Sequence, residues 1–308
     1  MAAARRPPHM NHAAPAGEMP LRFDCHGDAL VGVLHRPERL RRRGIVIVVG
    51  GGPQYRAGGH RQLTLWSRAL AVLGYPVLRF DYRGMGDSHG EFRGFTEIDD
   101  DIRAAVDQLI VQVPTLEEIV LWGECDASSA ILFYACRDPR VKGIVLLNPW
   151  VRTEAGQAKA ILRFYYLQRI MQPSFWRKLL GGKLNPFKAL RAALDVWRTA
   201  NTQAAGARGM VPNEAVSLHS PIPHELPLPE RMRLGAQRFG GQILLVLSGR
   251  DLIAKEFLQL IQGSPDWQRT LRDKPLTRHD LPEGDHTFSS AIQREQVLQW
   301  AVHWLEGW

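Results

Sequence analysis

Runs of apolar, β-branched residues recur along the chain, and most of them end in glycine or polar residues. Such continuous runs predict strands that are buried on both faces of a mostly parallel sheet. Two β-like runs on either side of Gly27 and Asp28 predict an antiparallel hairpin over residues 21–37. The other predicted strands are residues 44–52, 76–84, 117–123, 141–150 and 241–251, with a short one at 276–282.

Segments with a helical period follow these strands. Residues 60–75 place apolar side chains on one face and end near Gly74, a C-cap signal. Thr96 precedes an acidic first turn and predicts the N-cap of a helix over residues 95–113. Further helices are predicted over residues 126–138, near 253–262, and over 289–308.

This alternation of strands and helices stops after residue 150 and resumes near residue 239. It predicts an α/β fold with a mostly parallel, doubly wound sheet, interrupted after about the sixth strand by an insertion. We therefore expect a core over residues 20–150 and 239–308, with residues 151–238 as a helical lid. Residues 1–19 are rich in alanine and proline and predict a disordered leader.

The composition is that of an ordinary globular protein, with 308 residues, 45% hydrophobic and 23% charged. No run reaches the roughly 20 apolar residues of a membrane span, and the start has no apolar signal region. The three cysteines, Cys25, Cys125 and Cys136, have spacings that suit neither a disulfide framework nor a zinc site. We therefore expect a cytoplasmic protein with no cofactor and no metal.

The net charge of +8 is concentrated in one segment. Residues 150–200 hold ten lysines and arginines against Glu154 and Asp195, which is the whole excess. Such a segment could face anionic lipid at the inner membrane, an acidic substrate or a phosphate backbone, or be the solvated face of lid helices. We expect no nucleic-acid binding, because the core shows no basic groove with aromatic side chains.

A cysteine lies in the turn between a predicted strand and a predicted helix. The stretch Gly123-Glu124-Cys125-Asp126-Ala127 fits the pattern G-x-nucleophile-x-G, with alanine at the last small position. Such a turn strains the backbone at the nucleophile, and small flanking residues let strand and helix approach closely. The helix N-terminus would favour a thiolate and supply the N–H of Asp126 to an oxyanion. The other interpretation of Cys125 is that it is a small, unreactive residue of the hydrophobic core.

A cysteine nucleophile needs a base and a group that orients the base. Asp251 follows a predicted strand at its carboxyl end, and His286 follows the next strand, before the last helix. His279 and His303 lie within predicted elements instead. Asp251 could also be a helix N-cap, and His286 a loop histidine.

This order of nucleophile, acid and histidine resembles the α/β-hydrolase superfamily, from about residue 20 onward. The stretch "FDYRGMGDS" at 80–88 is similar to a segment after the fourth strand of these enzymes, where Arg83 and Asp87 are expected to form a turn. "GGGPQY" at 50–55 stands where the family carries the loop with the second oxyanion N–H.

The resemblance leaves three candidates for that second oxyanion N–H. Gly52 is the first choice, with Gly51 and Gln54 behind it. The histidine that the family usually carries in this loop is replaced by glycine. The loop lacks the Lys-Ser/Thr and the glycine spacing of a phosphate-binding loop, so we do not expect nucleotide binding.

Together with "GGGPQYRAGGHRQ" and "LRFDYRGMGDS", the stretch "LWGECDASSA" resembles the hydrolase 1 group associated with the exosortase A system. That resemblance implies a bacterial enzyme linked to exopolysaccharide production and sorted surface proteins. A Cys-His-Asp set on this fold also resembles dienelactone hydrolase, which opens lactones and lacks a long lid.

The sequence therefore predicts hydrolysis of an ester, thioester or lactone through an acyl-enzyme on Cys125. Glu124 and Asp126 oppose thiolate formation if they stay ionised. The aromatic and basic stretch 161–180 suits an amphiphilic acyl substrate, and equally ordinary packing of the lid. Three alternatives stay open: an acyltransferase, a peptide hydrolase suggested by the G-G-P-like loop of proline iminopeptidases, and a non-catalytic protein that binds lipid or a carrier.

Overall fold

The structure is a computed structural model, and it describes residues 17–52, 54–151 and 221–308. Most of the predicted leader and of the predicted lid, including the basic segment, lies outside the described residues. Eight strands form one sheet in the described part. They are β1 (Glu18–Cys25), β2 (Asp28–His35), β3 (Arg43–Val48), β4 (Val77–Asp81), β5 (Glu118–Glu124), β6 (Val141–Leu147), β7 (Gln242–Ser248) and β8 (Leu276–Leu281).

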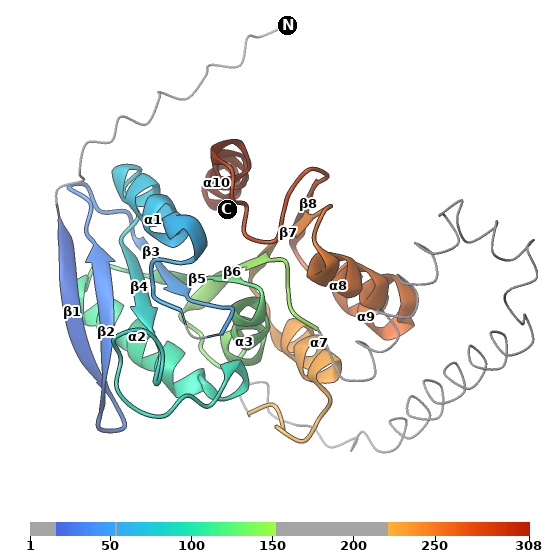
Figure 1. The fold of residues 1–308 in the computed structure, drawn as a ribbon, viewed down its shortest axis with the longest axis horizontal. Helices are drawn as coiled ribbons and strands as arrows, with labels where there is room; N and C mark the ends of the chain where they lie inside the picture. The colour runs from blue at the N-terminus through green and yellow to red at the C-terminus, as the bar shows by residue number, and fades with distance from the viewer. Residues whose placement is uncertain (1–16, 53, 152–220) are drawn as a thin grey trace, which may run out of the picture. The chain divides into compact units, whose positions relative to one another are not determined.

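The sheet has the order β1-β2-β4-β3-β5-β6-β7-β8 (Figure 1). β1 pairs with β2, and β2 with β4, in antiparallel fashion, and all other pairs are parallel. The central strands β3 and β5 are almost wholly buried, as their continuous apolar sequences predict. The carboxyl ends of β5, β6 and β7 therefore lie side by side at one edge of the sheet.

Helices cover both faces of this sheet (Figure 1). α1 packs against α10, whereas α2 and α7 both pack against α3. The described helices are α1 (Gln62–Val72), α2 (Asp99–Gln112), α3 (Asp126–Ala135), α7 (Leu228–Arg238), α8 (Leu252–Gly263), α9 (Pro265–Arg272) and α10 (Ala291–Glu306). Short 3-10 turns precede α1 and α2, at Gly59–Arg61 and Phe95–Glu97.

This architecture confirms the predicted α/β-hydrolase fold with an antiparallel N-terminal pair. Two details of the prediction were wrong. Thr96 is not an N-cap, because it lies in the 3-10 turn before α2. α2 begins at Asp99 without a side-chain cap, and the acidic residues of its first turn stabilise the helix through its dipole. α9 was missed, although Ser264 caps it with a hydroxyl that accepts from Trp267 N at 3.4 Å.

The end of the range that we expected to form the lid is described as α7. This helix packs closely on α3: a Cβ added at Gly235 would lie 2.0 Å from the carbonyl oxygen of Leu132. Glycine at this position therefore allows the two helices to touch.

The stretch "FDYRGMGDS" is held by ion pairs, of which the pair between Arg83 and Asp101 is buried. Arg83 pairs with Asp101, with an Nη2–Oδ2 distance of 2.8 Å. Arg56 pairs with both Asp81 and Asp87, and the N–H of Asp87 donates to Asp81 Oδ2 at 3.1 Å. Arg83 and Asp87 thus fix the path of the chain after β4, as the resemblance implied.

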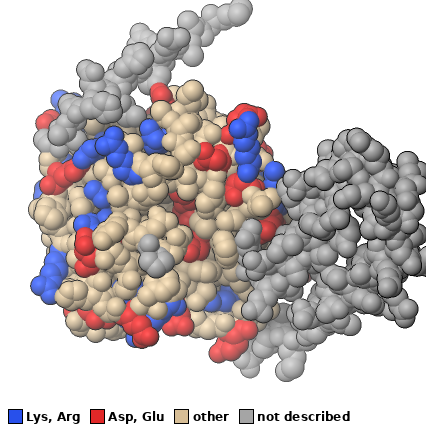
Figure 2. All heavy atoms as spheres, viewed as in Figure 1, with Lys and Arg blue, Asp and Glu red and all other residues tan. Residues whose placement is uncertain are grey.

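The charge of the described residues is nearly balanced. They hold 26 lysines and arginines against 28 aspartates and glutamates, so the positive excess belongs to residues outside the described ranges. On the face drawn in Figure 2, basic and acidic side chains are interspersed. None of the helices in the described part is long and apolar enough to cross a membrane.

Candidate active site

The turn between β5 and α3 holds Cys125 in a strained conformation. Its φ is 58° and its ψ is −125°, values that a side-chain-bearing residue rarely adopts. A Cβ added at Gly123 would lie 2.7 Å from Ile131 Cδ1 and 2.8 Å from the N of Ser128. The small residue before Cys125 is therefore required by the close approach of strand and helix. The geometry is that of a nucleophile elbow.

The two serines after Cys125 are bonded to the backbone. Ser128 Oγ donates to the carbonyl of Gly123 at 2.8 Å, and Ser129 Oγ donates to the carbonyl of Trp150 at 2.6 Å. Both residues are fully buried. Their hydroxyls tie α3 to the end of β5 and to the chain that follows β6, so both have a packing role.

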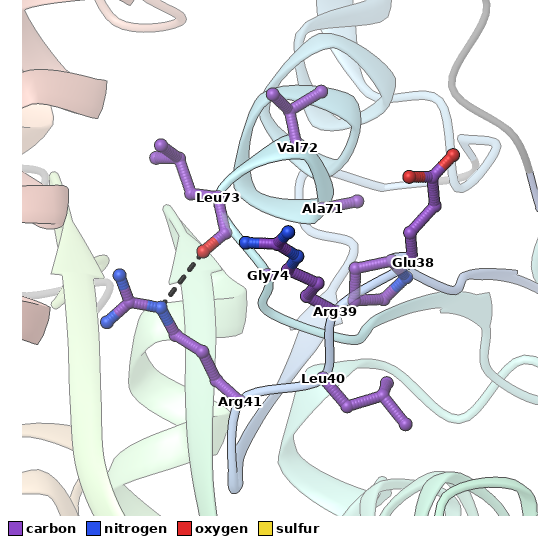
Figure 3. A pocket seen from close by; sticks show the side chains of 9 residues that line it. Glu38, Arg39, Leu40, Arg41, Ala71, Val72, Leu73 and Gly74 are labelled. Carbon is purple, nitrogen blue, oxygen red and sulfur yellow. Dashed lines mark hydrogen bonds between the residues drawn. The ribbon is translucent and has the colours of Figure 1, made fainter.

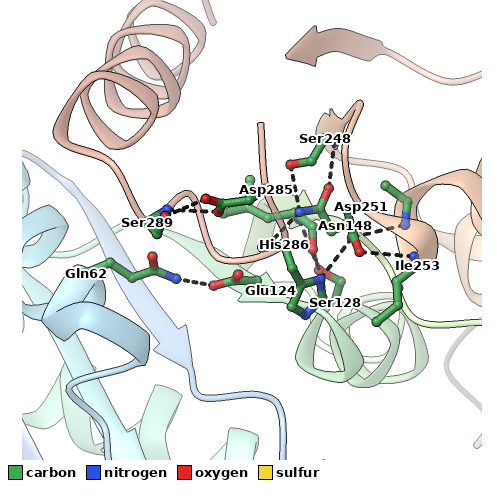
Figure 4. Close-up of polar contacts among 12 residues, drawn as sticks. Gln62, Glu124, Ser128, Asn148, Ser248, Asp251, Ile253, Asp285, His286 and Ser289 are labelled. Atoms are coloured by element: carbon green, nitrogen blue, oxygen red, sulfur yellow. Dashed lines mark hydrogen bonds and ion pairs between the residues drawn. The ribbon is translucent and has the colours of Figure 1, made fainter. Parts of the chain in front are cut away.

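Asp251 and His286 meet at the carboxyl ends of β7 and β8 (Figure 4). His286 Nδ1 lies 2.9 Å from Asp251 Oδ2. The same carboxylate accepts from the N–H groups of Ile253 and Ala254, each at 3.1 Å, and so caps α8. One carboxylate thus both caps α8 and contacts the His286 imidazole.

Burial raises the pKa of the Asp251 carboxyl. Its hydrogen bonds with His286, Ile253 and Ala254 together outweigh burial, so the pKa lies below the ordinary value. The pKa of His286 is raised to about 10, because Asp251 and then Cys125 form hydrogen bonds with its imidazolium. An ionised Asp251 thus holds a proton on the imidazole ring.

The Cys125 thiol is buried and faces the His286 imidazole. Burial raises the pKa of the thiol, and this outweighs the lowering effect of its hydrogen bond with His286. The charge of Asp126 raises the thiol pKa further. The structure therefore brings together Cys125, His286 and Asp251. The pKa of the Cys125 thiol lies above the ordinary cysteine value.

Asn148, which the sequence did not suggest, supports the loop that carries His286. Its Nδ2 donates to the carbonyl of His286 at 2.9 Å and to Ser248 Oγ at 3.0 Å, and its Oδ1 accepts from Ser248 N at 2.8 Å (Figure 4). Asn148 is fully buried and follows β6 at the carboxyl edge of the sheet. That position was the available signal, because side chains at this edge gather at the active sites of such folds.

An aromatic cluster links the strand that carries Cys125 to the loop that carries His286. The Trp66 ring on α1 lies 5.3 Å from the Trp122 ring and 6.3 Å from the Phe288 ring, measured between centroids. Trp66 Nε1 also donates to the carbonyl of Arg294 at 3.0 Å. α1 therefore braces both halves of the site.

Glu124 lies beside the site and is bonded to a residue that the sequence gave no reason to select. Its carboxyl accepts a hydrogen bond from Gln62 Nε2 (Figure 4). Burial raises the pKa of Glu124 to about 8, against the lowering effect of His286. Glu124 is therefore mostly protonated at neutral pH, and the objection that it opposes a thiolate loses most of its force.

The glycine loop 50–52 meets the elbow at Asp126. The N–H of Gly51 donates to Asp126 Oδ1 at 2.7 Å. Gly51 and Gly52 have φ values of 87° and 72°, which glycine adopts without strain. The loop and the start of α3 thus approach each other beside Cys125, where the resemblance placed the oxyanion donors.

A hollow in the surface lies apart from this site. A hollow of about 540 Å³ at the end of α1 is lined by residues that include Arg41 and Leu73, whose carbonyl accepts from Arg41 Nε at 2.9 Å (Figure 3). It adjoins the chain segments that enter β3 and β4, at the sheet edge opposite Cys125. Within the described residues, no group of three or more histidine, cysteine and acidic side chains could hold a metal ion.

The strand order, the elbow and the His–Asp pair define an α/β hydrolase of the esterase-like enzyme class. The comparison with family models agrees: residues 41–213 match the family described as "Serine aminopeptidase, S33". The match covers more than half of the chain, which therefore belongs to this family.

Comparison with curated proteins gives the quorum-quenching protein AidA of Acinetobacter baumannii (strain MDR-ZJ06), with 27% identity over 146 residues. The matched region covers 44% of this chain and 45% of AidA, less than half of either protein. At this length the match shows a related segment.

Solved structures with the same fold include the esterase Pf2001 of Pyrococcus furiosus, with a TM-score of 0.60 and 14% identity, covering 94% of this chain and 91% of that one. An α/β serine hydrolase without lid from Xanthomonas campestris gives a TM-score of 0.53 and 17% identity, with coverages of 95% and 97%. At these identities the likeness shows the fold.

Proposed function

We propose that the chain hydrolyses an ester, thioester or lactone through a covalent acyl-enzyme on Cys125. The observation that carries this proposal is the elbow at Cys125, whose thiol faces His286 while His286 Nδ1 lies 2.9 Å from Asp251. In a family named for serine enzymes, cysteine would here replace serine as the nucleophile.

The proposed reaction has two steps. His286 in its neutral form, whose fraction grows as pH rises toward 10, takes the thiol proton while the sulfur attacks the acyl carbon. The tetrahedral intermediate then expels the alcohol or thiol, which takes that proton from His286. A water molecule then gives a proton to His286 and attacks the thioester, which releases the acid and restores the thiol. Asp251 keeps the imidazole in the required tautomer and stabilises the imidazolium.

Backbone N–H groups would stabilise the oxyanion in both steps. Asp126 and Gly52 are the proposed donors, and one such donor lowers the activation barrier by about 3 kcal/mol. The close approach of loop 50–52 to the start of α3 supports this assignment.

The experiment compares wild type with Cys125→Ala, His286→Ala and Asp251→Asn on p-nitrophenyl esters of increasing chain length, an acyl thioester, a lactone and an aminoacyl p-nitroanilide. Cys136→Ala, which removes another buried thiol, is the matched control. We expect turnover and an acyl adduct by intact mass spectrometry in wild type and Cys136→Ala, and neither in Cys125→Ala. Equal turnover in all variants would refute the proposal, and preference for the anilide would favour the peptide-hydrolase alternative.

We also propose that residues 151–238 act as a lid whose basic segment contacts anionic membrane, and that the enzyme serves bacterial exopolysaccharide or exosortase metabolism. The sequence resemblance and the net charge of +8 over residues 150–200 support this setting. Sedimentation with vesicles of anionic or zwitterionic lipid tests the proposed membrane contact. Binding to anionic vesicles that is lost at high salt is expected, and no binding at low salt would exclude it.

A further inference from the structure

The carboxyl group of Asp126 fills the gap between the elbow and loop 50–52. The N–H of Gly51 donates to its Oδ1 at 2.7 Å. A Cβ added at Gly50 would lie 2.6 Å from the same oxygen and 2.4 Å from the carbonyl oxygen of Glu124. Only a glycine at position 50 therefore leaves space for this carboxyl group.

The groups around this carboxyl are hydrogen-bond donors of the backbone. Burial raises the pKa of Asp126, and hydrogen bonds from the N–H groups of Gly51, Ala127, Asp126 itself and Gly52 lower it against that effect. A cluster of inward-facing N–H groups at a helix start is an anion-binding arrangement. Here the anion-binding place is taken by a side chain of the protein.

Two of these donors, Asp126 N–H and Gly52 N–H, are the ones that our proposed function assigns to the oxyanion. A substrate carbonyl oxygen and the Asp126 carboxyl oxygens would therefore compete for the same N–H groups. An ionised carboxylate there would also repel the negative charge that develops on the substrate oxygen.

We propose that the Asp126 carboxyl group is an internal occupant of the oxyanion cradle, and that a substrate carbonyl must displace it before Cys125 can be acylated. This inference rests on the proposed function. It makes Asp126 a residue that slows acylation and selects substrates able to displace it. Alkylation of Cys125, which needs no oxyanion stabilisation, is not slowed by this occupancy.

The experiment measures two rates on the full chain: acylation of Cys125 by p-nitrophenyl acetate in a single turnover, and alkylation of Cys125 by iodoacetamide at the same pH. The variants are Asp126→Ala and the isosteric Asp126→Asn, with Asp266→Asn on the exposed surface of α9 as the charge-matched control. Taking the ratio of the two rates cancels any change in thiol pKa, because both reactions need the thiolate.

We expect the ratio of acylation to alkylation to rise at least about 10-fold in Asp126→Ala, which corresponds to roughly one hydrogen bond in the cradle. Asp126→Asn should lie between Ala and wild type, since its amide oxygen still accepts but carries no charge. Asp266→Asn should match wild type.

An unchanged or lower ratio in both Asp126 variants would overturn the inference and assign Asp126 to holding loop 50–52 in place. Failure of the proposed function has a different signature. In that case Cys125→Ala would release p-nitrophenolate as fast as wild type, or no variant would form an acyl adduct.

Discussion

The side-chain amide of Asn148 is joined to the backbone carbonyl of His286 by a hydrogen bond of 2.9 Å. Through the same side chain Asn148 also holds the end of β7, at Ser248. One buried residue thus fixes the loop that carries His286 relative to two strands of the sheet. We assign Asn148 as a positioning residue, because it acts through the backbone of His286.

Replacing Asn148 by alanine should therefore reduce kcat by about 10–10²-fold with little change in KM, because a misplaced base loses much of its general-base contribution. The measurement is steady-state kinetics on a p-nitrophenyl ester, with the pH profile as the second readout. Asn148→Asp keeps the acceptor for Ser248 N but loses the donor to His286, so it should also lose activity.

Tyr134→Phe is the control for Asn148, because it removes a buried hydrogen bond to Asp138 far from Cys125. It should lower the midpoint of thermal unfolding while kcat and the pH profile stay as in wild type. If Tyr134→Phe and Asn148→Ala reduce kcat equally, Asn148 has only a structural role.

The rate at which iodoacetamide alkylates Cys125 should rise from neutral pH toward pH 10. The pKa of the thiol is raised by burial, and that of His286 is raised to about 10 by its hydrogen bonds with Asp251 and Cys125. Both groups thus keep their protons at neutral pH, and the reactive form grows as pH rises. Asp251→Asn should move the midpoint to higher pH, because the imidazolium that lowers the thiol pKa loses its carboxylate partner and gives up its proton at lower pH. A profile that is flat across this range would contradict the assignment.

A serine at position 125 should convert the site to a slow serine hydrolase. The strained φ of 58° belongs to the backbone, so the elbow should survive Cys125→Ser. At neutral pH we expect turnover to fall by about 10²-fold, since a hydroxyl needs neutral His286 as its base, and to recover partly at higher pH. Fluorophosphonate labelling measures this directly. Absence of labelling at any pH would show that the elbow does not present residue 125 to His286.

Glu124 should make the folded state less stable as pH rises. Its folded pKa of about 8 lies above the ordinary value of 4.5, so its contribution to stability is fully present below pH 4.5 and is lost as pH rises toward 8. The loss is about 1.4 kcal/mol per pH unit at most. Glu124→Gln should flatten the pH dependence of urea unfolding between these limits, whereas Glu117→Gln, at an exposed position, should not. The same slope in both variants would refute the buried, protonated state of Glu124.

Much of the fold could be predicted because its strands carry local signals. The apolar runs gave β3 to β7 in order, and the small residues around Cys125 gave the elbow. Asp251 and His286 could be found because each follows a strand, and strand ends converge at one edge of a parallel sheet. These are properties of chain order and period, which a sequence displays directly.

The remaining features depend on contacts between distant segments. Gln62 reaches Glu124 at the end of β5 from the start of α1, and Asn148 reaches the loop of His286 from the end of β6. No spacing along the chain indicates either pair. The direction of the Asp126 side chain was equally hidden, because it depends on the absent Cβ at Gly50. Thr96 misled for a local reason: three successive acidic residues stabilise the start of α2 without a side-chain cap.

The aromatic brace at Trp66 has a consequence for biosynthesis. Cys125 directly follows β5, which pairs with β3 and β6, whereas His286 and Phe288 follow β8 and are made only after β7 and β8. A nascent chain would therefore hold the turn at Cys125 before the loop with His286 has been made. Docking of the Phe288 ring onto Trp66 would then bring His286 to Cys125, so on the proposed function a chain that stops before this loop would carry an inert thiol.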